Sequence, residues 1–201
     1  QQALMILNGE LFSTMNVLTQ LMRLQQVVAG SLRNEEGETI TLKNNRVQAV
    51  LDLLEETSGK VVIFAIFQTD IQELEKAIGE KFGEGAVASY YGKTPQDKRQ
   101  VIIDKFQDPD SELRYFVSNP QTGGRGITLT GANNMIFYSN SYDLELRVQA
   151  EDRIHRIGQE YSCTYIDLVA KGTVDEQILK NLLNKVKISN EVLGEVRNWF
   201  E

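Results

Sequence analysis

Two patterns of hydrophobic and polar positions divide the chain. Across residues 3–29 apolar side chains recur every three or four positions without a proline, which predicts a long amphipathic helix. The charged stretch 31–45 predicts a loop, and the spacing in 46–56 predicts a shorter helix. We therefore expect residues 1–58 to form a helical lead-in and residues 59–201 to form a separate domain.

From residue 60 onwards, short apolar runs alternate with helix-like segments. The run 61–67, VVIFAIF, is continuous and rich in β-branched residues, as in a parallel strand buried on both faces. Further strands are predicted at 86–91, 113–118, 134–139 and 161–170, with a helix over 143–157 between the last two. Such alternation is built from right-handed crossovers, so we predict an α/β fold with a mostly parallel sheet covered on both faces.

Polar residues follow the predicted strands at their carboxyl ends, where sheets of this kind bind ligands. These loops are 68–70, 92–94, 118–126 and 140–143. In the third loop Gly123, Gly124 and Gly126 would let the backbone approach an anion closely, although by themselves they favour a flexible turn. Lys93 and Thr94 precede a proline at the start of a predicted helix, which suits either phosphate binding or a simple helix cap.

The stretch 149–159, QAEDRIHRIGQ, concentrates a different chemistry. It sets Arg153 and Arg156 three residues apart, which a helix would place on one face. Two aligned guanidinium groups form a phosphate clamp or a pair of arginine fingers, whereas the acidic residues between them also allow a solvated helix face. His155, the one histidine of the chain, has no second His or Cys at ligand spacing, so no metal site is expected there.

Composition narrows the classes of function. The 201 residues are 41% hydrophobic, which is ordinary for a globular protein, and no apolar run approaches the roughly 18 residues that would span a membrane. The single cysteine, Cys163, excludes an internal disulfide and a thiolate zinc site, which favours a reducing compartment such as the cytoplasm. A net charge of −7 argues against a broad basic surface, so any contact with nucleic acid must be local.

Two motifs of nucleotide hydrolysis do not occur in these residues. There is no GxxxxGK[ST] phosphate loop, and no predicted strand ends in the acidic pair that would hold Mg²⁺. We therefore do not expect this chain alone to bind and hydrolyse a nucleoside triphosphate.

In their order along the chain, the motifs resemble the second RecA-like lobe of the superfamily-2 helicases, most closely the Swi/Snf-type DNA-dependent ATPases. The resemblance covers about residues 60–179. It rests on KVVIFAIF (motif IV), YYGKTPQDKRQVIIDKFQD, SNPQTGGRGITLTGANNMIFYSN (motif V and the next strand), QAEDRIHRIGQ (motif VI) and KGTVDEQIL. It implies a RecA-like three-layer fold, and the compact spacing of the motifs is similar to that of bacterial or phage members.

The resemblance further implies an ATP site shared between two lobes. ATP with Mg²⁺ would bind between this lobe and an N-terminal RecA-like lobe of the same polypeptide, which would carry the phosphate loop and the Mg²⁺ ligands. Arg153 and Arg156 would be arginine fingers, and Gln149 would orient the γ-phosphate or the attacking water. Gly126 and Thr128 would approach the ribose. By itself the lobe would be inactive.

DNA is the second partner that the resemblance implies. The backbone of one strand would be contacted, without readout of its sequence, by Gln68, Thr94, Ser118, Asn119 and Gly124. Outside these contacts, the sequence departs from the family pattern in motif V and in the segment before it. Thr128 replaces the usual Asn or Asp of motif V, and Tyr91 stands where an aspartate usually precedes the glycine.

These features predict the C-terminal motor lobe of an ATP-dependent DNA translocase or helicase. One alternative is a free-standing binding or regulatory module that kept the fold, although such a module has no physical need for both arginines. Another is a small α/β phosphate-binding enzyme with a complete site, which would lack a base in the proposed cleft. The predicted roles of the two arginines separate these interpretations.

Overall fold

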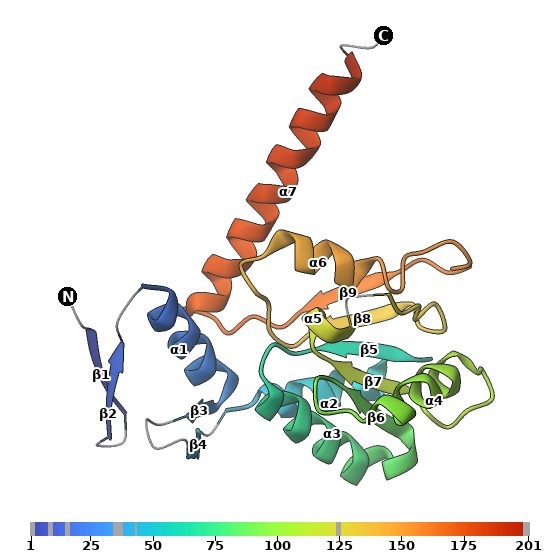
Figure 1. Ribbon diagram of the computed structural model, residues 1–201, viewed down its shortest axis with the longest axis horizontal. Coiled ribbons are helices and arrows are strands. Elements are labelled where there is room, and N and C mark those ends of the chain that lie inside the picture. Colours follow the sequence, from blue (N-terminus) through green and yellow to red (C-terminus); the bar gives the residue numbers. More distant parts are fainter. Residues whose placement is uncertain are drawn as a thin grey trace.

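A five-stranded parallel sheet forms the centre of the chain, in the order β6-β7-β5-β8-β9 (Figure 1). The computed structural model describes residues 3–7, 10–14, 17–33, 38–42, 44–123 and 126–198. The strands are β5 (Val61–Phe64), β6 (Val87–Tyr90), β7 (Tyr115–Ser118), β8 (Asn134–Phe137) and β9 (Thr164–Asp167). Each lies within a strand predicted from the sequence.

Alternating side chains give each face of the sheet its own core. Val61 and Ile63 pack with α2 (Arg46–Glu56) and α3 (Gln68–Phe82). Val62 and Phe64 pack with α4 (Gln96–Gln107) and α6 (Leu144–Glu151). All four strand residues are 0% exposed, and burying each such side chain contributes about 1.5–3 kcal/mol. The prediction of a mostly parallel α/β sheet covered on both faces is confirmed.

The register of the sheet brings the strand ends to one level. Phe64 lies opposite both Ser118 and Phe137, and these in turn lie opposite Tyr90 and Asp167. The loops that follow the five strands therefore gather on one side of the sheet. We call this side, with those loops, the carboxyl edge.

The lead-in differs from its predicted form. Instead of one helix over 3–29, the structure has an antiparallel hairpin of β1 (Ala3–Leu7) and β2 (Glu10–Thr14), and then α1 (Val17–Ala29). The predicted loop 31–45 contains a second hairpin, β3 (Ser31–Arg33) with β4 (Thr39–Thr41). The sequence reason for the first hairpin is Asn8-Gly9, a dipeptide that favours two-residue hairpins between apolar runs. The leucines of this stretch also fit a helical period, and this spacing is the reason that the sequence predicts a helix.

The predicted helix 46–56 is confirmed as α2, and it packs with the domain that follows. Val50 and Leu54 are 0% and 1% exposed and belong to the same core as β5. The division at residue 58 stays a prediction, but α2, on its N-terminal side, shares a core with the sheet.

Arg46, the first residue of α2, joins this helix to the last helix and to the carboxyl edge. It is 9% exposed, its Nη1 lies 2.5 Å from Asp175 Oδ2 at the start of α7 (Val174–Asn198), and its Nη2 donates to the carbonyls of Tyr138 and Leu168. The hydroxyl of Tyr138 donates to Ala29 O at 3.4 Å. Figure 1 shows the base of α7 beside α1. The helices α1 and α7 thus contact each other.

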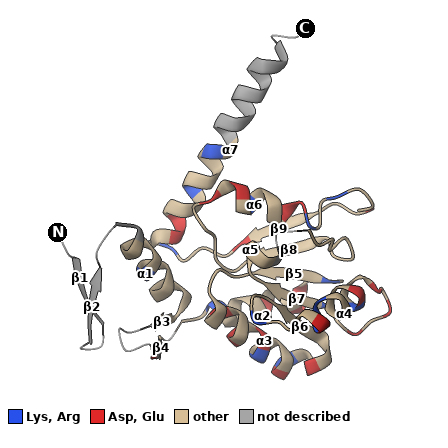
Figure 2. Ribbon diagram, in the orientation of Figure 1, with Lys and Arg blue, Asp and Glu red and all other residues tan. Residues whose placement is uncertain are grey.

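Charge is mixed over the outer helices. Figure 2 shows acidic and basic residues interspersed along α3 and α4, and among the residues it colours no continuous basic stripe is visible in this view. This agrees with the net charge of −7, which argues against a broad basic surface. Within the described ranges, no helix combines the length and the hydropathy needed to cross a membrane.

Candidate functional site

The predicted helix 143–157 ends early, and both arginines lie beyond it. Asp143 caps α6 by accepting from the N–H groups of Glu145 and Leu146 at 2.9 and 3.4 Å, and the helix ends at Glu151. The chain then turns, because Leu129 N donates to Arg153 O at 2.9 Å and takes a carbonyl that a longer helix would use. The prediction that a helix face aligns the two arginines is wrong.

The two arginines are instead aligned by a neighbouring segment. Arg153 donates from Nη1 to Ile127 O at 3.2 Å and from Nε to Gln149 O at 2.9 Å. Arg156 donates from Nη1 to Thr128 Oγ1 at 3.1 Å. We call the paired segments 126–132 and 149–159 the arginine seam.

The guanidinium groups in the seam lie close enough to influence each other. Burial lowers the pKa of Arg153, and the positive charge of Arg156 lowers it further, while Asp152 opposes both. Arg stays protonated despite such a shift, so two like charges are held side by side. An anion placed between them would relieve the repulsion.

A tight turn holds Arg156 in place. Gln159 N donates to Arg156 O at 2.9 Å, and Gly158 between them has a φ of +102°. That φ is strained for residues with a Cβ, which explains the glycine. The side chain of Arg156 is exposed, and so are those of Ile157 and Tyr161, at 101% and 70%.

The structure brings most of the predicted ATP residues to the seam. Thr128 is half-buried and touches Arg156, and Gly126, with a φ of +77°, lies exposed two residues earlier. Gln149 contributes its carbonyl to Arg153, whereas its amide Nε2 donates to Glu145 Oε1 at 2.8 Å on the surface of α6.

Thr94, a predicted DNA contact, faces inward at the carboxyl edge. It is 9% exposed; its Oγ1 accepts from Tyr91 N at 2.9 Å and donates to Ser89 O at 3.3 Å. Pro95 occupies the N-cap of α4, and no side chain caps the helix. The hydroxyl therefore shapes the loop after β6 and does not cap α4, as one interpretation of the sequence had it.

Ser118 and Asn119, at the end of β7, also use their side chains internally. Ser118 is 0% exposed and its hydroxyl donates to Tyr90 O. Asn119 donates from Nδ2 to Ile66 O at 2.6 Å and accepts at Oδ1 from Gln121 N at 2.8 Å. Both side chains thus join neighbouring strands and loops at the carboxyl edge.

Gln68 is the exposed member of the predicted DNA set. It begins α3 and lines a hollow of about 410 Å³ together with Lys93 and with Gln26 of α1. Gly124, the remaining member, lies outside the described residues. The structure therefore places Gln68, Thr94, Ser118 and Asn119 at the carboxyl edge, apart from the seam.

Sequence reasoning missed Arg147, which fixes α6 to the sheet. Its Nε lies 2.5 Å from Glu151 Oε1, its Nη2 lies 3.2 Å from Asp167 Oδ2, and its guanidinium carbon lies 3.5 Å from the ring centre of Phe137. The only local signal was the four-residue spacing to Glu151. The contact with Asp167, at the end of β9, depends on the fold.

Metal-binding groups are not gathered in the described part of the chain, where no three His, Cys, Asp or Glu side chains are placed to hold an ion. Cys163 is half-buried, and burial raises the pKa of its thiol. A raised pKa disfavours the thiolate, the form in which a cysteine acts as a nucleophile.

Comparison with known proteins decides the family. Residues 43–158 match the family described as Helicase conserved C-terminal domain. The chain belongs to this family. The matched range contains all the predicted site residues of this helicase C-terminal domain, from Gln68 to Arg156.

Relatives of this helicase C-terminal domain are much longer proteins of Swi/Snf type. The DNA excision repair protein CSB of rice is 31% identical over 149 residues, which cover 74% of this chain and 12% of that protein. The SWI/SNF-related matrix-associated actin-dependent regulator of chromatin subfamily A member 1 of mouse is 33% identical over 106 residues, which cover 53% of this chain and 10% of that protein. The chain thus spans about a tenth of their length.

A solved structure supports the fold. The crystal structure of the C-terminal part of the Fun30 ATPase domain matches with a TM-score of 0.62 and 29% identity, covering 71% of this chain and 48% of the other. The RecA-like three-layer fold and the likeness to Swi/Snf-type helicases are confirmed.

Proposed function

We propose that this helicase C-terminal domain is the C-terminal motor lobe of an ATP-dependent DNA translocase or helicase. ATP with Mg²⁺ binds between it and an N-terminal RecA-like lobe of the same polypeptide, which supplies the phosphate loop and the Mg²⁺ ligands. The observation that carries the proposal is the arginine seam, where one segment accepts from both guanidinium groups: Arg153 donates to Ile127 O, and Arg156 donates to the hydroxyl of Thr128.

Arg153 and Arg156 are the arginine fingers in this proposal. Each guanidinium has five N–H donors. Within the described residues, Arg153 uses Nε and Nη1 and Arg156 uses Nη1, so donors remain on both groups for phosphate oxygens. Fingers of this kind contribute on the order of 10³ to 10⁵ in rate, because they meet charge that develops in the transition state.

The rest of the seam positions the nucleotide. Thr128 accepts from Arg156 through its hydroxyl, and the same hydroxyl can still donate to a ribose oxygen. Gly126, two residues earlier, allows the backbone to approach the sugar. Gln149 lies one turn of α6 before Arg153, and its amide turns from Glu145 towards the γ-phosphate or the attacking water when ATP is bound.

DNA is bound at the carboxyl edge, by contacts with its backbone and without readout of sequence. Gln68 makes a direct side-chain contact, because it is exposed beside Lys93. Thr94, Ser118 and Asn119 act through the loops that their buried or half-buried side chains shape. Gly124, which lies outside the described residues, is proposed as a further contact with the DNA backbone.

The test is the DNA-stimulated ATPase activity of the full gene product with Arg153→Ala and Arg156→Ala. Each variant should lose at least about 10³-fold in turnover and keep its unfolding temperature. Arg114→Ala is the matched control, because the guanidinium of Arg114 donates to Gly59 O and, within the described residues, makes no hydrogen bond to the seam. Its turnover should stay within roughly twofold of the unchanged protein. Normal turnover in both seam variants would show that the arginines are not fingers.

A further inference from the structure

Gln159 lies at the end of the loop that carries Arg156, one residue past the range that matches the family. We infer that Gln159 is a positioning residue for Arg156, acting by holding this loop against residues 130–132. The inference rests on the proposed function, because it assumes that Arg153 and Arg156 act on ATP. It adds a residue that neither contacts nor faces the nucleotide in that proposal.

The side-chain amide of Gln159 is used at both ends. Nε2 donates to Ala132 O at 2.8 Å, to Ile154 O at 3.1 Å and to Thr130 O at 3.2 Å, so its two hydrogens are shared among three carbonyls. Oε1 accepts from Tyr161 N at 3.0 Å. One half-buried amide therefore joins the arginine loop to the segment that enters β8.

These bonds bracket Arg156 on both sides. Ile154, two residues before Arg156, is 0% exposed and gives its carbonyl to the Gln159 amide. Three residues after Arg156, the backbone N–H of Gln159 closes the turn onto Arg156 O. Hydrogen bonds to Gln159 thus fix the main chain both before and at Arg156. A change in the position of Gln159 should therefore move Arg156.

Residues 130–132, which accept from the Gln159 amide, are themselves held in place by hydrogen bonds. Gln107 of α4 accepts from Gly131 N at 2.7 Å and donates to Thr130 Oγ1 at 3.3 Å. Ala132 is 1% exposed and its N–H donates to Leu129 O at 3.0 Å. Leu129 N in turn donates to Arg153 O, so hydrogen bonds also connect this segment to the first arginine.

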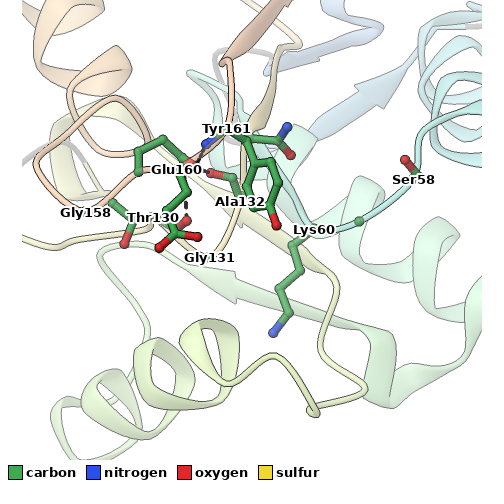
Figure 3. Close-up of a pocket in the computed structure, with 11 residues that line it drawn as sticks. Ser58, Lys60, Thr130, Gly131, Ala132, Gly158, Glu160 and Tyr161 are labelled. Carbon is green, nitrogen blue, oxygen red and sulfur yellow. Dashed lines mark hydrogen bonds between the residues drawn. The ribbon is translucent and has the colours of Figure 1, made fainter.

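Packing holds this loop at Ile154 but not at its tip, so hydrogen bonds, among them those of the Gln159 amide, constrain the residues beyond Ile154. Ile157 and Tyr161 are 101% and 70% exposed. On the inner side, a hollow of about 450 Å³ is lined by residues 58–60, 130–133 and 158–161. Figure 3 shows Thr130 and Gly131 close to Gly158 and Glu160, with Ser58 on the far side. The loop has room to shift once the amide is removed.

The expected effect is on catalysis more than on the fold. The lost hydrogen bonds join neutral groups, and a loop bordered by solvent and a hollow can relax when they are removed. A shift of about 1 Å in a group that acts in the transition state costs on the order of 10²-fold in rate.

The experiment measures kcat and the KM for ATP in the full gene product with Gln159→Met and Gln159→Glu. Met removes the amide without adding charge, whereas Glu keeps the length and turns the donor into an acceptor facing three carbonyls. Gln177→Met is the control, because Gln177 is exposed on α7 and its amide reaches only Asn181 within the described residues. We expect kcat to fall about 10²-fold in both Gln159 variants, with KM changed less than about threefold.

A combined variant tests whether the effect passes through the arginine. If Gln159 acts by positioning Arg156, adding Gln159→Met to Arg156→Ala should slow the residual turnover by less than about threefold. A full additional loss in the combined variant would overturn the inference. Unfolding of both Gln159 variants would overturn it too, because the amide would then hold the fold and not the arginines.

The inference and the proposed function can fail separately. If Arg156→Ala turns over ATP normally, the proposed function is wrong. If Arg156→Ala loses turnover while Gln159→Met keeps kcat within about threefold of the unchanged protein, the arginine-finger proposal is supported and Gln159 has no positioning role.

Discussion

The carboxyl edge and the arginine seam hold their polar side chains in opposite ways. At the carboxyl edge, Ser118 and Thr94 are 0% and 9% exposed, and their hydroxyls bond to the main chain of β6 and its loop. At the seam, Arg156 is exposed and donates one N–H to Thr128 within the described residues. The first arrangement uses hydrogen bonds to shape the backbone, and the second keeps donors available.

This contrast shows that polar residues of a motif divide into two kinds. A buried hydroxyl with a carbonyl partner stabilises the fold, because an unsatisfied buried carbonyl costs about 1–3 kcal/mol. An exposed guanidinium contributes little to the fold, but it can meet an anion through several N–H groups. Substitutions should therefore change stability at the carboxyl edge and turnover at the seam.

The largest effect on stability is expected at Arg46. Arg46→Met leaves Asp175 and two carbonyls buried without their partner, which should lower the free energy of unfolding by about 3–5 kcal/mol. Urea unfolding of the chain measures this. Lys76→Ala is the control, because Lys76 pairs with Glu80 at 3.9 Å on the surface and should contribute at most about 0.5 kcal/mol. Equal losses in both variants would contradict the account of the carboxyl edge.

The next effect concerns Asp70 and depends on pH. Burial raises the pKa of Asp70 from 3.8 to about 7, despite hydrogen bonds from Thr69 and Ser31. The native state therefore keeps a proton that the unfolded chain loses above pH 3.8, so stability falls as pH rises towards 7 and then levels off. At about 1.36 kcal/mol per pH unit, the full change is on the order of 4 kcal/mol.

Asp70→Asn tests this by removing the titration. Urea unfolding from pH 4 to pH 8 should show a smaller loss of stability with pH in the variant than in the unchanged protein. The variant should also gain stability relative to the unchanged protein as pH rises. Parallel pH profiles for the two proteins would show that the carboxyl group of Asp70 does not carry the dependence.

A smaller effect on stability is expected at Ser118. Ser118→Ala removes the donor to Tyr90 O and should cost about 1–3 kcal/mol in the free energy of unfolding. The affinity of the folded full gene product for DNA should change by less than about twofold, because the hydroxyl is buried. A large loss of DNA affinity at unchanged stability would place Ser118 on the DNA after all.

The smallest effect is expected at Gln68. In contrast to Ser118, substitution of this exposed residue should change DNA binding and not stability. Gln68→Ala should weaken DNA binding by about 0.5–1.5 kcal/mol and leave the unfolding temperature unchanged. Because Gln68 is neutral, the salt dependence of binding should stay the same, whereas Lys93→Ala should reduce the salt slope by about 1. DNA titrations at several salt concentrations measure both. An unchanged affinity in Gln68→Ala would remove this residue from the interface.

The central sheet could be predicted from the sequence because buried parallel strands leave a strong local signal. The run 61–67 is continuous and apolar, and the core on both faces of β5 explains why. The hairpin of β1 and β2 was missed, because its leucines also fit a helical period. There, Asn8-Gly9 was the better signal.

The sequence could name candidate site residues, but it could not predict which contacts hold their side chains. The identity of Arg153 and Arg156 followed from motif VI, yet their alignment depends on Leu129 and Thr128, which the fold brings from a distant part of the sequence. Nor does a sequence tell whether the hydroxyl of Thr94 faces a ligand or its own backbone. Gln159 escaped notice for the same reason, since its three acceptors lie on two segments.

The central claim is that Arg153 and Arg156 act on the transferring phosphoryl group and not on the fold. Its most direct test is the affinity of the full gene product for ADP with and without aluminium fluoride, which mimics that group. The unchanged protein should bind ADP with aluminium fluoride at least ~10²-fold more tightly than ADP alone. Arg153→Ala and Arg156→Ala should lose most of this gain and keep their affinity for ADP. If both variants keep the gain, the claim is contradicted.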